Sequence, residues 1–221
     1  GMIGGICNNP EDYASFYHNY KGRRYRHDQV HNLFGYYMTR SASEAFERYV
    51  PEKRILLFSR ASYIGMHRFG GIWQGDNASW WSHLKMNVKM MPSLNMCGFL
   101  YTGADVGGFG ADATEDLVLR WLEFAVFTPL LRNHSARGTR RQEVYRFSHV
   151  EKFADVIGVR YQILPYIYSE YMKAALRNTM MFNPLSFLYG EDAMAGQVED
   201  QLFIGENVMV APVCEQNVTG R

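Results

Sequence analysis

The sequence predicts an α/β fold, the C-terminal half of a (β/α)8 TIM barrel followed by the beginning of a C-terminal β domain. Short apolar runs alternate with longer amphipathic ones, and each apolar run ends in a polar or charged side chain. Alternating β and α elements imply a parallel sheet, and groups at successive strand ends are what such a barrel presents at its catalytic face. The four strand-end groups are Arg60, Asp76, Asp105 and His134.

Helical periodicity identifies the longer elements. Apolar residues at helical spacing predict helices over residues 31–48, 79–95, 114–127 and 148–177. Asp112 with Glu115 resembles a capping box for the third helix, and Ser148 with Glu151 resembles one for the fourth.

Apolar runs between the helices predict strands over residues 54–60, 69–72, 97–105 and 128–135. The first run does not alternate with polar residues, so we expect it to be buried on both faces. Farther along, residues 181–188 fit a return strand and residues 200–213 fit a hairpin. We therefore expect residues 1–185 to form the partial barrel, with 1–30 as a surface connection, and residues 186–221 to begin a β-sandwich domain.

Composition excludes several classes of partner. The 221 residues are 47% hydrophobic, and 23 Lys and Arg are scattered among 22 Asp and Glu, so there is no basic face for nucleic acid. No apolar run reaches the roughly 18 residues that suggest a membrane helix. Cys7, Cys97 and Cys214 are too far apart for a disulfide framework or a metal cluster. We expect no nucleic acid, membrane or metal partner, and a reducing, cytoplasmic compartment.

Asp76 is the first candidate for a catalytic group. It follows the strand-like run of residues 69–72 and a glycine turn at Gly75, which places a carboxylate at the carboxyl end of a strand. Asp-Asn ahead of a helix also fits an N-terminal cap. Asp105 similarly fits an Asx residue that stabilises its loop, and His134 fits a residue that caps a turn.

Several short motifs support an assignment in the order in which they occur. They are Ser59-Arg60-Ala61, Trp73-Gln74-Gly75-Asp76-Asn77, Tyr101-Thr102-Gly103-Ala104-Asp105-Val106-Gly107-Gly108-Phe109, Arg132-Asn133-His134-Ser135 and Arg160-Tyr161. In this order they resemble glycoside hydrolase family 31, the α-glucosidases and α-xylosidases, over residues 31 to about 213. The resemblance implies a retaining hydrolase that acts on terminal α-linked sugars of oligosaccharides and needs no metal or organic cofactor.

The resemblance also implies roles for individual residues. Asp76 matches the general acid/base. The implied substrate-binding residues are Arg60, Trp73, Asp105, Phe109 and His134. Arg60 and His134 would hold sugar hydroxyls, and the aromatic residues would form apolar wall. Retaining hydrolysis needs a donor that is protonated near neutral pH and a carboxylate nucleophile about 5–5.5 Å away.

The family's nucleophile lies in a Trp-x-Asp-Met-Asn-Glu motif, which the 221 residues do not contain. We therefore expect the isolated chain, as a fragment of an α-glucosidase, to have little or no activity, because general acid catalysis alone contributes roughly 10²–10⁴ in rate. The alternatives are an α-xylosidase fragment and a non-catalytic half barrel that binds sugar or self-associates. Unpaired strand edges would favour a homo-oligomer.

Overall fold

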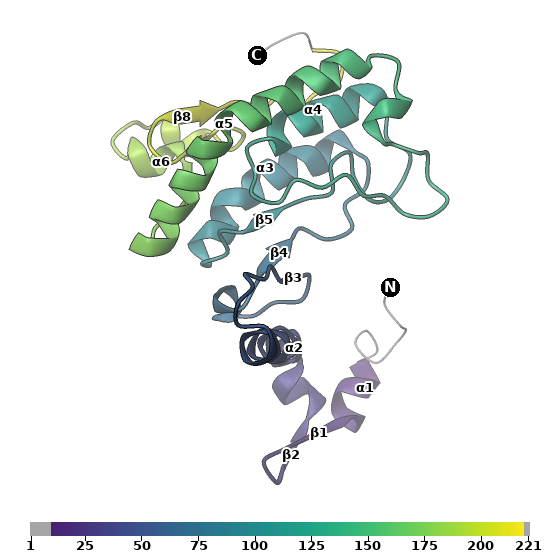
Figure 1. Ribbon diagram of the computed structural model, residues 1–221, viewed down its shortest axis with the longest axis vertical. Helices are drawn as coiled ribbons and strands as arrows, with labels where there is room; N and C mark the ends of the chain where they lie inside the picture. The colour runs from purple at the N-terminus through teal and green to yellow at the C-terminus, as the bar shows by residue number, and fades with distance from the viewer. Residues whose placement is uncertain (1–9, 219–221) are drawn as a thin grey trace. The chain divides into compact units, whose positions relative to one another are not determined.

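The computed structural model describes residues 10–218 and divides at Gly70 and Gly71 into two compact units (Figure 1). Cys7 lies outside the described residues. Within the described part, no helix is both long and apolar enough to cross a bilayer.

The first unit contains a hairpin that the sequence did not predict. The elements of this unit begin with α1 (Pro10–Ser15), β1 (Tyr17–Tyr20), β2 (Arg23–Arg26) and α2 (His27–Tyr49). β1 and β2 pair antiparallel, joined by Lys21 and Gly22 with φ of 48° and 75°. Glycine adopts positive φ readily, so this dipeptide makes the turn. The expected surface connection therefore contains regular structure.

The predicted first helix is confirmed as α2, which starts at His27, before the expected residue. The side chain of Gln29 accepts the backbone N–H of Arg26 at 3.0 Å, which satisfies a donor at the helix start. Gly35 lies on its buried face, where a Cβ would stand 2.7 Å from the Cβ of Ala61. A glycine there lets the following segment pass close to the helix.

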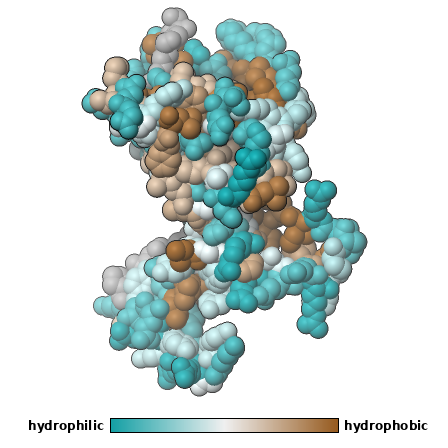
Figure 2. Space-filling view, turned by 90° about the vertical axis from the view of Figure 1, so that its left-hand side faces the viewer, coloured by the Kyte–Doolittle hydropathy of each residue, from teal (hydrophilic) through white to brown (hydrophobic). Residues whose placement is uncertain are grey.

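The prediction of a fully buried strand over residues 54–60 is wrong. Only β3 (Phe58–Ser59) forms, and Ile55 and Leu56 are 39% and 55% exposed. A continuous apolar run reports burial only where other elements cover both faces, which is a property of the fold rather than of the run. Figure 2 shows that hydrophobic side chains remain at the surface in separate patches among hydrophilic ones. The unit ends after η1 (Met66–Arg68), whose Met66 is fully buried.

The second unit alternates strands and helices as predicted. In chain order it contains β4 (Gly71–Trp73), α3 (Trp81–Met96), β5 (Thr102–Gly103), α4 (Glu115–Ala125), η2 (Val144–Arg146) and α5 (Val150–Arg177). β4 and β5 pair in parallel, with Ile72 opposite Thr102 and Trp73 opposite Gly103, and α3 makes the crossover. Figure 1 shows α3, α4 and α5 packed in that order on the side of β5. Their buried faces share one core.

The predicted helices over 79–95, 114–127 and 148–177 are confirmed, but their caps differ from the expected ones. Thr114 caps α4, because its hydroxyl accepts the N–H of Leu117 at 3.3 Å. Asp112 instead accepts the N–H of Arg140 at 2.5 Å, and Glu115 accepts the N–H of His149 at 2.8 Å. Both carboxylates are used by distant loop residues, so no capping box forms between them.

The predicted strands over 97–105 and 128–135 are much shorter in the structure. Residues after α3 turn at Gly98, with φ of 88°, and the strand begins only at Thr102. The segment after α4 meets it through a single parallel bridge, Asp105 to Arg132. The N–H of Leu130 donates to the carbonyl of Thr102 at 3.2 Å. The segment after α4 therefore pairs with the segment that contains β5, but it does not form a strand of the predicted length.

The C-terminal part forms a small antiparallel sheet. After α5 come β6 (Phe182–Pro184), α6 (Leu185–Leu188), η3 (Ala195–Gln197), β7 (Leu202–Ile204) and β8 (Val208–Val210). β7 and β8 confirm the predicted hairpin, and β6 is the return strand, cut short by α6. Since β6 and β7 share one sheet, the domain boundary expected after residue 185 falls between two paired strands. That boundary stays a prediction.

Candidate functional site

The turn after β4 presents Asp76 where the sequence placed it. Gln74 continues the parallel ladder, donating its N–H to the carbonyl of Gly103 at 2.9 Å, and Gly75 then reverses the chain with φ of 80°. Asp76 follows, exposed. The alternative reading as a helix cap is wrong, because α3 begins at Trp81 and its N-cap residue is Trp80. We call residues 74–77 the acid turn.

Asp105 stands at the end of the next strand, but it is held differently. Its side chain is 0% exposed, its Oδ1 accepts a hydrogen bond from Nε of Arg132 at 2.7 Å, and the same oxygen lies 2.6 Å from Nη2 of Arg132 in an ion pair. Its Oδ2 makes no hydrogen bond among the described residues. The carboxylate therefore pairs with an arginine, and the Asx-type loop bond considered above is not what holds it.

The electrostatics of Asp105 show which charged groups lie near it. Burial raises the pKa of Asp105 above its ordinary value, against the hydrogen bond and the charge of Arg132, which lower it. His134 lowers this pKa further and the negative charge of Asp76 raises it. Because charge interactions fade over a distance of about 10 Å, Asp76 and His134 each lie near Asp105.

The glycine-rich loop after β5 is fastened to the acid turn. The N–H groups of Phe109 and Gly110 donate to the carbonyl of Asn77 at 2.7 and 3.0 Å. Gly108 has φ of 87°, and a Cβ on it would lie 2.7 Å from the backbone of Ala78. Only glycine allows this close approach without displacing the neighbouring chain. The acid turn and the loop therefore form one bonded unit.

Aromatic side chains contact the charged residues of the site. The rings of Phe109 and His134 lie 5.2 Å apart between centroids, and the guanidinium of Arg132 lies 5.4 Å from the ring centroid of Trp73. The structure thus brings five predicted residues together, namely Trp73, Asp76, Asp105, Phe109 and His134. Arg60 belongs to the first unit, just after β3, and is exposed. The roles of all six stay predictions.

Three further residues of this site had no role in the sequence analysis. Arg132 lies inside a quoted motif, yet its pairing with Asp105 depends on strands that meet only in the fold. Gln142 is 2% exposed and donates from Nε2 to the carbonyls of Val106 and Gly108 at 2.9 and 3.0 Å. Asn87 bonds the acid turn from α3. No local pattern distinguishes these two amides from other polar residues.

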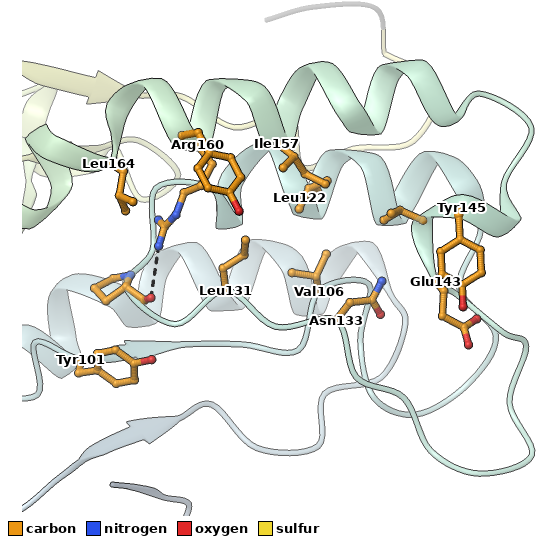
Figure 3. Close-up of a pocket in the computed structure, with 13 residues that line it drawn as sticks. Tyr101, Val106, Leu122, Leu131, Asn133, Glu143, Tyr145, Ile157, Arg160 and Leu164 are labelled. Carbon is orange, nitrogen blue, oxygen red and sulfur yellow. Dashed lines mark hydrogen bonds between the residues drawn. The ribbon is translucent and has the colours of Figure 1, made fainter. Parts of the chain in front are cut away.

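A cavity of about 560 Å³ lies elsewhere in this unit, between the segment after α4 and α5 (Figure 3). Val106, Leu131 and Asn133 line it. Alternate residues of an extended chain point to opposite faces, so Asp105 and Arg132 face away from it. Arg160 reaches it from α5 but donates to the carbonyls of residues 126 and 128 at 2.6 and 2.8 Å. The cavity is therefore distinct from the site around Asp76.

Comparison of the sequence with known proteins gives consistent matches. Residues 5–170 match the family described as "Glycosyl hydrolases family 31 TIM-barrel domain". The chain is 34% identical over 208 residues to Alpha-glucosidase 2 of Bacillus thermoamyloliquefaciens, covering 92% of this chain and 26% of that protein. It is 31% identical to human Neutral alpha-glucosidase AB, covering 89% and 21%. The chain thus spans about a quarter of the length of the curated relatives that it matches.

Solved structures agree. A family 31 dextranase of Flavobacterium johnsoniae, complexed with glucose, superposes with a TM-score of 0.86 at 27% identity, over 96% of this chain and 27% of that one. A family 31 α-glucosidase of Bacteroides thetaiotaomicron gives 0.79 at 32% identity, over 88% and 34%. These matches confirm the predicted partial TIM barrel. The chain belongs to glycoside hydrolase family 31.

Proposed function

We propose that this chain is the part of a retaining α-glucosidase that carries the proton donor, Asp76, and much of the subsite for the sugar. The observation that supports this most directly is the position of Asp76, which is exposed on a fixed turn at a strand end and close enough to Asp105 for its charge to act on that carboxylate. Relatives named α-glucosidases, and a dextranase structure that contains glucose, support α-linked glucose as the substrate.

In the first step Asp76 donates its proton to the glycosidic oxygen as the bond from that oxygen to C1 breaks. A carboxylate nucleophile on the opposite face of the ring forms a glycosyl ester at C1. In the second step Asp76 takes a proton from the water that attacks C1 and releases the sugar. Trp73 and Phe109 form the apolar wall of the sugar subsite, and His134 holds sugar hydroxyls.

The chain itself provides a test of the donor, because it contains no Trp-x-Asp-Met-Asn-Glu motif. With a chromogenic α-glucoside alone we expect no turnover. Azide can replace a missing nucleophile, since its nitrogen attacks C1 from the β face and expels the aglycone. We therefore expect slow azide-dependent formation of β-glucosyl azide from a nitrophenyl α-glucoside.

The variant Asp76→Asn identifies the donor in this assay. It should lose azide-dependent turnover with a poor leaving group, which needs a proton, and keep it with a dinitrophenyl leaving group, which does not. Equal rates for both proteins on both substrates would refute the assignment of Asp76. Parallel α-xylosides test the alternative specificity, and faster turnover of the xyloside would replace α-glucosidase by α-xylosidase.

A further inference from the structure

A cluster of three side-chain amides lies beneath Asp76. Gln74 and Asn77 belong to the acid turn on either side of it, and Asn87 comes from α3. Asn87 is 0% exposed and Asn77 is 5% exposed. Asn87 therefore has no surface with which to touch a substrate, and any influence on the chemistry passes through the turn.

The hydrogen bonds of Asn87 join both ends of the acid turn. Its Nδ2 donates to Oε1 of Gln74 and to Oδ1 of Asn77, both at 2.5 Å. Nδ2 of Asn77 closes the turn on the carbonyl of Gln74 at 3.0 Å, and Nε2 of Gln74 returns to the carbonyl of Asn87 at 3.4 Å. The backbone of Asp76 lies between two residues tied to one side chain, so it cannot swing outward without breaking these bonds.

Asn77 extends this constraint to the glycine loop. Its carbonyl accepts the N–H groups of Phe109 and Gly110, and the ring of Phe109 contacts His134. Displacing Asn77 would therefore disturb the acid turn and one aromatic wall together. The two parts of the site that must face the same sugar are positioned through one buried amide.

The cluster costs stability, which argues that it serves more than packing. Oδ1 of Asn87 is buried and makes no hydrogen bond among the described residues, and such an orphaned acceptor costs about 1–3 kcal/mol. An apolar residue at this position would avoid that cost, but it would take away the donor that Oε1 of Gln74 and Oδ1 of Asn77 share. A reacting group must be held within about 0.5 Å of its productive place, so a costly polar tether is expected beneath a proton donor.

We propose that Asn87 is the positioning residue for the proton donor, acting through Gln74 and Asn77. This tether depends only on hydrogen bonds within the chain, whereas its consequence for ligand binding rests on the proposed function. The experiment tests the tether and the ligand binding separately.

The test compares Asn87→Leu with Asn95→Leu. Both keep the number and branching of the side-chain heavy atoms and remove an amide from α3. Asn95 is 3% exposed, and its Oδ1 accepts the N–H groups of Met181 and Phe182 at 3.0 and 2.9 Å, so it serves as a matched control that does not bond the acid turn. Amide hydrogen exchange by NMR is the first measurement.

In Asn87→Leu we expect exchange to accelerate at least about tenfold at Phe109 and Gly110, because the carbonyl that they bond becomes mobile, and to stay unchanged at Phe182. Asn95→Leu should show the reverse. If Asn87→Leu does not fold, Asn87→Ser keeps one donor and should give a smaller effect of the same pattern. Equal acceleration at both places, or none at Phe109 and Gly110, would overturn the tether.

The second measurement is calorimetric binding of 1-deoxynojirimycin, a cationic glucose mimic that pairs with carboxylates. We expect the Kd to weaken about tenfold in Asn87→Leu, equivalent to about 1.4 kcal/mol, and to stay at the wild-type value in Asn95→Leu. A purely structural role would weaken both equally and would overturn the positioning role. If the wild-type chain binds no mimic, the proposed function fails, and hydrogen exchange still decides the tether.

Discussion

Replacing Arg132 by methionine should destabilise the chain by about 3–5 kcal/mol at neutral pH, the usual cost of leaving a buried charge unpaired. Arg132 donates a hydrogen bond from Nε to Oδ1 of Asp105, whose side chain is 0% exposed, and its Nη2 forms an ion pair with the same oxygen. Methionine keeps much of the volume but none of the donors. Losing the cation from the face of Trp73 removes a further contribution of about 0.5–1 kcal/mol.

The loss of stability should depend on pH, and the direction of this dependence follows from the pKa of Asp105. Burial raises this pKa, and Arg132 opposes the rise, so the substitution should raise the pKa further. Between the unfolded and folded pKa values the folded state binds more protons than the unfolded one, so the free energy of unfolding falls as pH rises through that window. In Arg132→Met this window between the two pKa values extends to higher pH. The stability that the variant loses relative to the wild type should therefore be small near pH about 4 and complete near pH about 7.

Urea unfolding at several pH values measures this difference. Arg120→Met is the control, because Arg120 is similarly exposed, at 22% against 28%, but pairs with the partly exposed Glu123 at 3.0 Å. An exposed pair contributes at most about 1 kcal/mol, so this variant should lose little stability at any pH. Equal losses for the two variants, or a loss in Arg132→Met that does not vary with pH, would refute the reasoning.

Three further predictions concern other parts of the chain. Gly108→Ala should lower the melting temperature more than Gly138→Ala. The backbone φ is positive at both glycines, 87° and 94°, but only at Gly108 would the new Cβ meet backbone, at 2.7 Å. Equal shifts in melting temperature would contradict this close approach. Thr114→Ala removes the cap of α4 and should cost about 1 kcal/mol in urea unfolding, and no loss would mean that the cap contributes nothing. We also expect self-association at high concentration, with Leu56→Lys reducing it because Leu56 is 55% exposed; light scattering that gives the mass of one chain would count against this.

Helices could be predicted from the sequence because their pattern is local. α3 and α5 fall close to the residues expected for them, since the spacing of apolar side chains alone determines which face is buried. Strand lengths could not be predicted in the same way, because a strand extends only where another chain segment pairs with it. The hairpin of β1 and β2 was missed for a related reason. Its side chains do not alternate between polar and apolar, and the turn depends on positive φ at Lys21 and Gly22.

The site shows the same division. Asp76 was identified because a strand, a glycine and a carboxylate are consecutive in the sequence. The residues that position the site are far apart in the sequence: Asn87 is separated by ten residues from the Asn77 side chain that it bonds, and Asp105 is separated by 27 residues from Arg132. Sequence motifs reveal groups that react, whereas the residues that position them are recognisable only when the fold brings them together.

The two carboxylates at neighbouring strand ends illustrate why such positioning residues are needed. Asp105 is fixed by burial of its own side chain and by an arginine, an arrangement that holds a charge in place. A group that must give and take a proton at a sugar has to remain exposed, so its own side chain cannot be fixed by burial. Its backbone must then be fixed instead, from beneath. The amides under the acid turn do this for Asp76, which is why the exposed carboxylate, and not the buried one, fits the proton donor.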